Sequence, residues 1–367
     1  MKKVCLIVTD AVSFNSLYRG QLEFLRDNSD FSITLISGGN LSEIKKLQAK
    51  NIGKFLDFGF KREPSVAVDI ISLTRLFMFL LFNRFDLIVY STPKALLLGS
   101  LASSLTFQKK RVAMIRGRAY ENYTGKNRKF FAFLDKVSLK ISTETLFISN
   151  SLKKLYIQEG LTEPVKASIL GLGSSNGVDT TCFLPSKIKS NTFTVVMVGR
   201  ICVDKGIKDL LEILSRLNNR NIKILLFGSV EGSESQDLLD DIVNSYSFVE
   251  YCGQTNNVED VFKQAHLHLF LTHREGFGNV AIEAASSGVP TFSYDVVGVQ
   301  DSVKEGVSGK RFPAGDYDEI AAAIDDASTD PLFLQKYSEA RDWAVGNFDQ
   351  QKVWRNYLEY FNSHLAP

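Results

Sequence analysis

The chain has 367 residues, of which 44% are hydrophobic and 23% charged, and its formal net charge is +2. Such a composition excludes a disordered chain, and no low-complexity tract or repeat of about 20 to 50 residues is present. At about 100 to 200 residues per domain, the length allows two separate hydrophobic cores. The four cysteines have no paired spacing, which argues against disulfides and zinc and favours a reducing cytoplasm.

The first half of the chain alternates short apolar segments with helical stretches. We predict strands at residues 4–8, 32–36, 87–90, 111–115 and 145–148. The run at 4–8 is too short for a signal peptide, and we interpret it as the first strand. The most apolar segment, 76–82, is far shorter than the roughly 20 residues that span a bilayer, so we expect no transmembrane helix.

The alternation begins again after Pro185 and the polar stretch 186–192. Strands are predicted at residues 194–198, 223–227, 249–251, 267–271 and 291–293. Strands that alternate with helices predict parallel sheets, so we expect an α/β protein with two Rossmann-like domains. We place the first domain at residues 1–187 and the second at 188–349, followed by a helix over about 350–367.

The segment 272–290 says most about function, because it forms a glycine-containing turn between a strand and a helix. Gly276 and Gly278 allow the backbone to approach a ligand closely, and the unpaired N–H groups of the helix N-terminus favour a negative charge. Glu275 lies in the turn and Glu283 about 6 Å further along the helix. Carboxylates accept hydrogen bonds from hydroxyl groups. A diphosphate between two polyhydroxyl groups, as in a nucleotide sugar, fits this arrangement.

This segment resembles the donor site of the retaining GT-B-fold glycosyltransferases of family 4, in which seven residues separate two glutamates. The matching residues are Glu275, Gly276, Phe277, Gly278, Glu283, Ala284, Gly288 and Pro290. Upstream, Gly199, Arg200, Lys205 and Gly206 resemble the family's Gly-Arg…Lys-Gly turn. Segments 174–183 and 298–309 also follow the family order. The chain is most similar to enzymes that build bacterial surface polysaccharides, including transferases that extend a sugar on undecaprenyl diphosphate.

The resemblance implies a GT-B fold, in which two Rossmann-like domains face each other across a cleft. The nucleotide sugar would bind the second domain and the acceptor the first, with the last helix crossing back onto the first domain. Arg200 and Lys205 would hold the diphosphate, which suits their two positive charges. Glu283 would bind the ribose hydroxyls and Glu275 the donor sugar. The predicted donor-binding residues are Gly199, Arg200, Lys205, Gly228, Glu275, Gly276, Phe277, Gly278, Asn279, Val280 and Glu283.

The predicted catalytic residues are Glu275, Arg200 and Lys205. In the family the mechanism is usually front-face, with the leaving phosphate helping to deprotonate the acceptor, so no protein nucleophile is expected. We expect no metal and no cofactor, because the two cations and the helix N-terminus can stabilise the leaving diphosphate. The donor is expected to be a UDP-sugar, because this is the usual donor in the family.

Two other patterns are open to a metal interpretation. His266 and His268 alternate on a strand, but without a third ligand we interpret them as structural. The sequence Asp316-Tyr317-Asp318 resembles the Asp-x-Asp metal motif of GT-A transferases. Its position after Pro313 instead predicts a loop and a helix start.

The charges are distributed unequally along the chain. Residues 1–185 contain 26 Lys and Arg against 15 Asp and Glu, whereas residues 186–367 contain 17 against 26. This predicts an anionic partner for the first half. Basic residues cluster at 109–111, 116–118 and 126–129, and the last cluster precedes Phe130, Phe131 and Phe133.

Basic and aromatic residues together are typical of a membrane-binding face. The alternative is that the basic residues face the solvent and the phenylalanines beside them are buried inside the protein. No nucleic-acid-binding motif accompanies the basic clusters, so we expect no nucleic acid. We expect a cytoplasmic protein that associates peripherally with the inner face of a bacterial membrane.

The acceptor side is less defined by the sequence. The first strand leads to a loop and a Gly-Gln pair, as in the related enzymes, but where many members have paired glycines this chain has residues 12–15. The candidate acceptor residues are Phe14, Asn15, Arg116, Arg118 and Glu121. An equal alternative for Arg116, Arg118 and Glu121 is that they are surface charges on a loop and do not bind the acceptor.

The sequence therefore predicts a retaining transferase that moves a hexose or N-acetylhexosamine from a nucleotide sugar to a glycan. The acceptor would be a lipid-linked oligosaccharide in the synthesis of O-antigen, capsule or a related surface polysaccharide. One alternative is a sugar-nucleotide epimerase on the same fold. The other is a degenerate transferase that serves as a scaffold, although Arg200, Lys205 and both motif glutamates are present.

Overall fold

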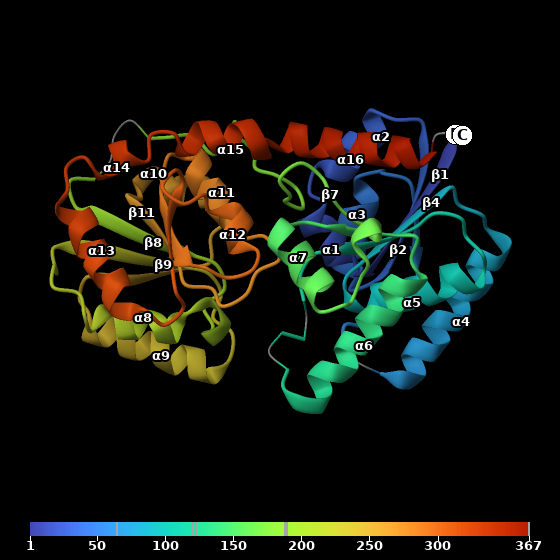
Figure 1. The fold of residues 1–367 in the computed structure, drawn as a ribbon, viewed down its shortest axis with the longest axis horizontal. Coiled ribbons are helices and arrows are strands. Elements are labelled where there is room, and N and C mark those ends of the chain that lie inside the picture. The colour runs from blue at the N-terminus through green and yellow to red at the C-terminus, as the bar shows by residue number, and fades with distance from the viewer. Residues whose placement is uncertain (64, 119, 122, 187–189, 366–367) are drawn as a thin grey trace. The chain divides into compact units, whose positions relative to one another are not determined.

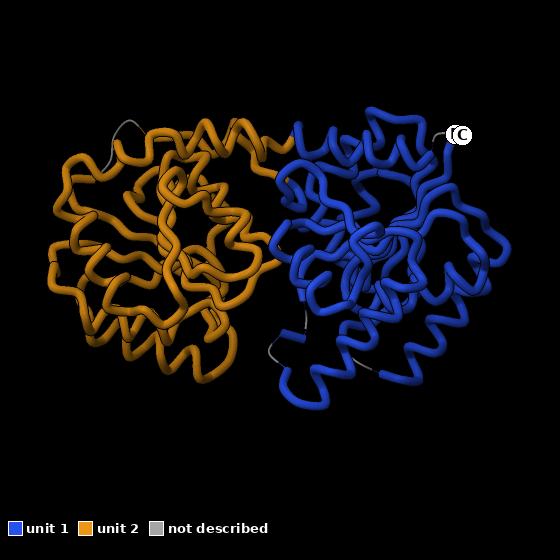
Figure 2. Tube along the Cα trace, viewed as in Figure 1, with its two compact units in different colours: residues 1–176, 351–367 blue, residues 177–350 orange. Residues whose placement is uncertain are grey.

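The computed structural model describes residues 1–63, 65–118, 120–121, 123–186 and 190–365 (Figure 1). The chain forms two compact units, one of Met1–Asn176 with Gln351–Pro367 and one of Gly177–Gln350 (Figure 2). Each unit is built on a parallel sheet, which confirms the predicted α/β fold class with two Rossmann-like halves. The predicted boundary between residues 187 and 188 lies outside the described residues.

Unit 1 contains a seven-stranded parallel sheet in the order β3-β2-β1-β4-β5-β6-β7. The strands are β1 (Lys2–Asp10), β2 (Phe31–Gly38), β3 (Lys54–Asp57), β4 (Leu87–Ser91), β5 (Arg111–Ile115), β6 (Glu144–Phe147) and β7 (Ala167–Ile169). In the sheet centre, Leu6 pairs with Leu35 on one side and Val89 on the other. All five strands predicted in this half are confirmed, whereas β3 and β7 at the sheet edges were not predicted.

The helices of unit 1 cover both faces of its sheet (Figure 1). They are α1 (Ala11–Leu17), α2 (Gln21–Asp27), α3 (Leu41–Ala49), α4 (Val66–Phe82), α5 (Pro93–Leu105), α6 (Gly125–Ile141), α7 (Asn150–Gln158) and α16 (Gln350–Leu365), with a 3₁₀ turn at Pro164–Lys166. Helices α4, α5 and α6 pack side by side on one face. The last helix joins the core of unit 1, where Trp354 Nε1 donates to Asn176 Oδ1 at 2.9 Å.

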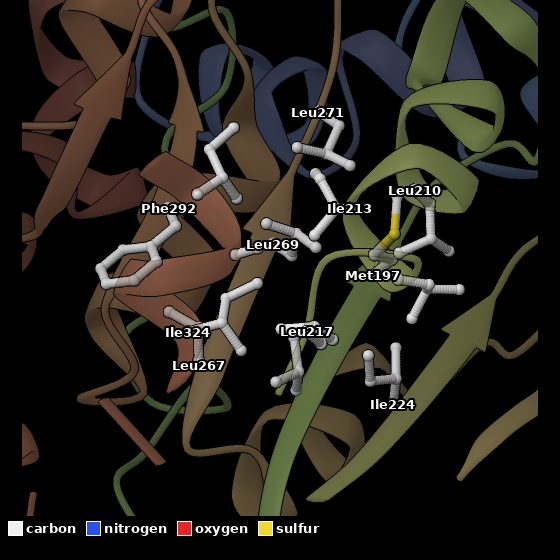
Figure 3. Packing of buried hydrophobic residues seen from close by; sticks show 14 of the residues in the cluster. Met197, Leu210, Ile213, Leu217, Ile224, Leu267, Leu269, Leu271, Phe292 and Ile324 are labelled. Atoms are coloured by element: carbon white, nitrogen blue, oxygen red, sulfur yellow. The ribbon is translucent and has the colours of Figure 1, made fainter. Parts of the chain in front are cut away.

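Unit 2 contains a six-stranded parallel sheet in the order β10-β9-β8-β11-β12-β13. The strands are β8 (Phe193–Val198), β9 (Ile222–Phe227), β10 (Val249–Gly253), β11 (Leu267–Phe270), β12 (Thr291–Tyr294) and β13 (Gly309–Phe312). The five strands predicted here are confirmed, and the edge strand β13 was not predicted. Figure 3 shows part of the core, in which Met197, Leu269 and Phe292 from three strands pack with Leu210 and Ile213.

The helices of unit 2 follow its strands in the order expected for a Rossmann-like half. They are α8 (Ile207–Leu214), α9 (Ser233–Ser245), α10 (Val258–Gln264), α11 (Asn279–Ser286), α12 (Val299–Ser302), α13 (Tyr317–Thr329), α14 (Phe333–Lys336) and α15 (Ala340–Phe348), with a 3₁₀ turn at Val203–Lys205. Asp316 is the N-cap of α13 and accepts a hydrogen bond from the backbone N–H of Glu319. This confirms the helix start predicted for the Asp-x-Asp sequence.

The two strand histidines have structural partners. The Nδ1 atom of His266 accepts a hydrogen bond from the backbone N–H of Thr194 at 3.1 Å. His268 is fully buried, 3.1 Å from the Thr291 hydroxyl, and burial lowers its pKa to about 3. Both therefore serve packing, as expected. Within the described part of the chain, no helix is long and apolar enough to cross a bilayer.

Candidate functional site

A cavity of about 420 Å³ opens in unit 2 beside the carboxyl ends of β8 and β11. Parallel α/β sheets commonly bind ligands at this edge, because the loops that follow neighbouring strands meet there. The cavity brings together seven of the predicted donor residues: Gly199, Arg200, Lys205, Glu275, Gly278, Asn279 and Val280. Two motifs about 75 residues apart in the sequence thus form one site, and the roles of their residues in binding stay predictions.

Gly228, another predicted donor residue, does not line this cavity but shapes its wall. A Cβ atom at this position would lie 1.7 Å from the carbonyl oxygen of Gly199, and the φ angle of Gly228 is +152°. The backbone N–H of Gly199 donates to the carbonyl of Phe227 at 2.9 Å, which holds the two segments together. Only glycine allows this close approach of two backbones.

Gly228→Ala should therefore destabilise unit 2 by about 2 kcal/mol or more, because the new methyl group must push the β8 turn away. The measurement is thermal denaturation of the full chain, with nucleotide affinity as a second readout. Gly232→Ala is the matched control, since its φ is also positive at +87° but no atom lies within 4 Å of the added Cβ. An equal loss of thermal stability in the two variants would show that the close approach of Gly228 to Gly199 does not determine the effect of the substitution.

Arg200 lies on the turn after β8 and pairs with Glu231 at 2.6 Å. Both side chains are 49% exposed. Ion pairs of this kind contribute only about 0 to 1 kcal/mol, because water and salt screen them. The guanidinium can therefore exchange this partner for an anionic ligand in the cavity at little cost.

Lys205 is held more firmly than Arg200. Its ammonium group forms a short ion pair with Glu275 and donates to the Thr272 hydroxyl at 3.2 Å and the Arg274 carbonyl at 3.4 Å. The sequence analysis assigned Lys205 and Glu275 to different parts of the ligand and did not predict that they pair. The pair places a positive and a negative group side by side at the cavity wall, each about one-fifth exposed.

The loop after β11 carries Glu275 and is held in place by three further contacts, two to Asp204 and one to Asp209. Arg274 pairs with Asp204 through Nε at 3.0 Å and Nη2 at 2.5 Å, and the backbone N–H of His273 donates to the Asp204 carbonyl at 3.0 Å. The His273 side chain reaches Asp209 at 2.8 Å. Sequence reasoning missed these supporting residues, although Asp209 stands out as a charged residue on the buried face of α8.

Asp209 is the centre of a buried polar cluster. Its carboxylate accepts hydrogen bonds from the Tyr294 hydroxyl at 2.9 Å and the Tyr317 hydroxyl at 3.2 Å, besides its contact with His273. Burial alone would raise the pKa of Asp209, but the hydrogen bonds from His273 and the tyrosines outweigh it and lower the pKa. The same hydrogen bond raises the pKa of His273. The cluster therefore holds an ionised carboxylate under the loop.

Helix α11 begins at the cavity with Gly278 as its N-cap, in the left-handed conformation at φ +89°. The side chain of Phe277 is buried and packs on Phe348, so only its backbone can meet a ligand, as predicted. Glu283 is the fifth residue of α11 and is partly buried. It does not line the cavity itself, and neither does the partly buried Gly276 in the turn.

Two of the predicted acceptor residues belong to the N-terminal helix α1 in unit 1. Phe14 is fully buried in the core, so its side chain is not available to an acceptor and the prediction needs correction to a packing role. The amide of Asn15 donates to the Glu43 carbonyl at 3.0 Å and to its carboxylate at 2.8 Å. This bond ties α1 to α3, and a contact of Asn15 with an acceptor stays a prediction.

The remaining acceptor candidates follow β5. The Arg116 guanidinium lies 4.2 Å from the centroid of the Tyr18 ring, and its three nitrogens have no hydrogen-bond partner among the described residues. Arg118, in contrast, is buried and donates to both carboxylate oxygens of Glu159 at 3.1 and 2.9 Å, which favours a structural role. Glu121 is partly buried and lies between positions 119 and 122, which are not among the residues that the structure describes. Arg116 is therefore the strongest acceptor candidate.

The chain is similar to known glycosyltransferases. Residues 182–342 match the family model described as Glycosyl transferases group 1. The chain is 30% identical over 380 residues to the capsular polysaccharide biosynthesis glycosyltransferase CapM of Staphylococcus aureus, covering 99% of this chain and 98% of that protein. It is 24% identical to the Escherichia coli UDP-Gal:alpha-D-GlcNAc-diphosphoundecaprenol alpha-1,3-galactosyltransferase, over 78% of each chain.

A solved structure shares the fold over the whole length. The crystal structure of Anabaena HepE in complex with UDP superposes with a TM-score of 0.77 and covers 99% of this chain and 100% of that one. The sequence identity is 17%, so the likeness concerns the fold.

Proposed function

Because the chain belongs to the group 1 glycosyl transferases and has the GT-B fold, we propose that it transfers a hexose or N-acetylhexosamine from a UDP-sugar to a glycan, with retention of configuration. The observation that carries the proposal is the cavity of unit 2, where Arg200, Lys205 and Glu275 meet the N-terminus of α11. Two cations, a carboxylate and the N-terminus of a helix are groups that suit a sugar diphosphate. The resemblance of its two motifs to the donor site of the retaining family 4 supports the proposed retention of configuration.

Each group in the cavity has a proposed part in binding the donor. Arg200 exchanges its exposed partner Glu231 for the diphosphate, and Lys205 approaches the same group from the other wall. Glu275 accepts hydrogen bonds from the donor sugar while still paired with Lys205, because a carboxylate has about four acceptor positions. Glu283 accepts from the ribose hydroxyls. UDP is supported by the names of two similar proteins, one an enzyme that uses UDP-Gal and one crystallised with UDP.

The chemistry rests on stabilising charge rather than on a protein nucleophile. As the bond between sugar and phosphate breaks, the leaving diphosphate gains negative charge beside Arg200, Lys205 and the N-terminus of α11. Groups fixed in advance around such a charge are commonly the largest contribution to catalysis. The leaving phosphate helps to deprotonate the acceptor on the same face of the sugar. We propose that no metal is required, so that treatment with a chelator leaves the rate of transfer unchanged.

The acceptor we propose is a lipid-linked oligosaccharide in the synthesis of a bacterial surface polysaccharide. The Staphylococcus relative is named for capsular polysaccharide and the Escherichia coli relative for a sugar on diphosphoundecaprenol. Unit 1 supports this with 28 Lys and Arg against 15 Asp and Glu, which suits a diphosphate acceptor at an anionic membrane. Arg116, whose guanidinium has no hydrogen-bond partner in the described part of the chain, is the residue we assign to that acceptor.

Calorimetric titration with UDP, GDP and ADP tests the donor site directly. We expect UDP to bind, and Glu283→Ala to weaken it about tenfold or more, because a hydrogen bond to a charged group contributes about 1.5 to 3 kcal/mol. The control is Glu339→Ala, an exposed glutamate of the same unit whose side chain caps no helix. If none of the three nucleotides binds, the proposal is wrong and a scaffold without a donor site replaces it.

A further inference from the structure

Exposed apolar side chains are concentrated on one part of unit 1. Among the described residues, 19 large hydrophobic side chains are exposed, and 11 of them lie between Val66 and Phe133. They belong to α4, to the end of α5 and to α6 with the segment just before it. The three helices pack side by side on one face of the sheet (Figure 1), so the exposed side chains belong to neighbouring elements of unit 1.

Helix α4 has an apolar row on its outward side. Val66, Ile70, Met78 and Phe82 follow one another at multiples of four residues, and they are 78%, 59%, 46% and 77% exposed. The opposite side of the helix is buried in the protein through Ser72, Leu76 and Leu80. A surface helix normally has polar residues on its outer face. Because α4 has 17 residues, its apolar row extends over about 25 Å.

The same surface continues over the neighbouring helices. On α6, Phe130 and Phe133 are 57% and 60% exposed, which contradicts the alternative of a solvated face over buried phenylalanines for these two residues. Phe107, just after α5, is 83% exposed. Its segment is bound to the end of α4, because Gln108 Nε2 donates to the Leu80 carbonyl at 2.8 Å. We call the outward faces of α4 and α6 with residues 105–107 the apolar surface.

Positive charges surround the apolar surface. Residues 61–141 contain 15 Lys and Arg but only five Asp and Glu. Two of the acids are already engaged, Asp69 with Lys94 at 2.8 Å and Asp86 with the backbone N–H of Lys3 at 2.7 Å. The exposed lysines of this region are Lys61, Lys109, Lys110, Lys126, Lys129, Lys136 and Lys140. The surface therefore combines apolar side chains with a strongly positive rim.

We propose that the apolar surface lies on a bilayer that contains anionic lipids, with α4 parallel to the membrane plane. Its apolar row would enter the boundary between headgroups and acyl chains, and the lysines would meet the lipid phosphates. A protein partner fits less well, because lysine is depleted in protein interfaces. A second copy of this chain would bring two positive units together. The inference rests on the proposed function, since a lipid-linked acceptor requires the enzyme at a membrane.

Flotation of the full chain with vesicles tests this surface. We expect the protein to bind vesicles of equal parts phosphatidylglycerol and phosphatidylcholine more strongly than vesicles of phosphatidylcholine alone. The variant Ile70→Ser/Met78→Ser/Phe82→Ser should lower the partition coefficient at least about tenfold, because three apolar side chains no longer enter the lipid. The matched control is Leu41→Ser/Val165→Ser/Leu332→Ser, which changes three equally exposed apolar residues elsewhere and should bind like the wild type.

A second variant separates charge from apolar contact. Lys126→Glu/Lys129→Glu/Lys136→Glu should remove the preference for the anionic vesicles, since these lysines lie on the outward side of α6. The inference is overturned if wild type binds neither vesicle, or if the triple serine variant binds as strongly as wild type. It is also overturned if the wild type sediments as a dimer and the triple serine variant as a monomer, because α4 would then bind a second copy.

Failure of this inference and failure of the proposed function give different results. The apolar surface belongs to unit 1, whereas the donor cavity belongs to unit 2. The triple serine variant should therefore keep its UDP affinity and its rate with an acceptor dissolved in detergent, while losing activity on an acceptor embedded in vesicles. Absence of UDP binding in the wild type would instead contradict the proposed function and leave the vesicle result unaffected.

Discussion

Lys205→Ala should lower kcat for sugar transfer about 100- to 1,000-fold, the usual effect of removing one group that stabilises a developing negative charge. The ammonium group lines the cavity next to Glu275, and no other lysine within the described ranges of the chain lines this cavity. Since the leaving diphosphate gains charge only as the bond breaks, Lys205 contributes more to the transition state than to donor binding. We therefore expect kcat to fall more than KM rises, in steady-state measurements with a UDP-sugar.

The variant has a second effect that must be separated from the first. Removal of Lys205 leaves the carboxylate of Glu275 without its ion-pair partner in a partly buried position. Because Glu275 is itself assigned to the donor sugar, the double variant Lys205→Ala/Glu275→Gln is compared with Glu275→Gln alone. If the activity is lost because of the unpaired charge, the two should be equally active, since the glutamine is neutral. If the missing cation is the cause, the double variant is slower than Glu275→Gln alone, which is the result that we expect.

Lys263→Ala is the matched control for Lys205→Ala. Lys263 is also in unit 2 and also forms an ion pair, with Asp260 at 2.6 Å, but it lies on the exposed side of α10. Its removal should change kcat less than twofold. A Lys205→Ala enzyme that differs from wild type only in KM would show that the lysine binds the donor without promoting the reaction.

The sequence predicted the fold well where strands are buried on both faces. The central strands β1, β4, β8 and β11 are continuous apolar runs, because helices cover both sides of a parallel sheet. The missed strands β3, β7 and β13 are sheet edges of three or four residues. A short edge strand such as Gly309–Phe312, with Lys and Arg at its centre, has no apolar run from which to predict it.

The candidate site was predictable in its members but not in its contacts. The resemblance of two motifs to one donor site implied that Arg200, Lys205 and Glu275 belong together, and the cavity brings them together. The ion pair between Lys205 and Glu275 could not be predicted, because it depends on how two loops 70 residues apart are placed. The same applies to Asp209, whose three partners come from β12, α13 and the loop after β11.

Asp209→Ala should lower the stability of unit 2 by about 3 kcal/mol, because it leaves the buried hydroxyl group of Tyr294, the partly buried hydroxyl group of Tyr317 and the His273 ring without their acceptor. For a unit of this size the thermal midpoint should fall by about 10 °C. The control is Asp318→Ala, whose carboxylate pairs with Arg216 but whose side chain is 89% exposed. That variant should stay within about 0.5 kcal/mol of wild type, and equal losses would contradict a structural role for Asp209.

The pH dependence identifies the ionic part of this cluster. The hydrogen bond to Asp209 raises the pKa of His273. The charged form of His273 therefore contributes its full stabilisation below the unfolded pKa of about 6.5. This contribution to the free energy of unfolding is lost as the pH rises through the folded pKa. The pKa of Asp209 is lowered, so its carboxylate stays ionised throughout this range. The stability difference between wild type and His273→Gln should therefore be larger at pH 6 than at pH 8. Because His273 is 43% exposed, the difference is small.

Asp209 also connects the stability of unit 2 with the proposed donor site. It holds His273, and Glu275 follows two residues later on the same loop. Asp209→Asn keeps the shape of the side chain but loses the charge, so the loop should remain folded yet less fixed. We expect UDP to bind a few times more weakly to this variant, by calorimetry, while Asp318→Ala binds normally. Unchanged affinity would mean that the contact between Arg274 and Asp204 alone positions Glu275.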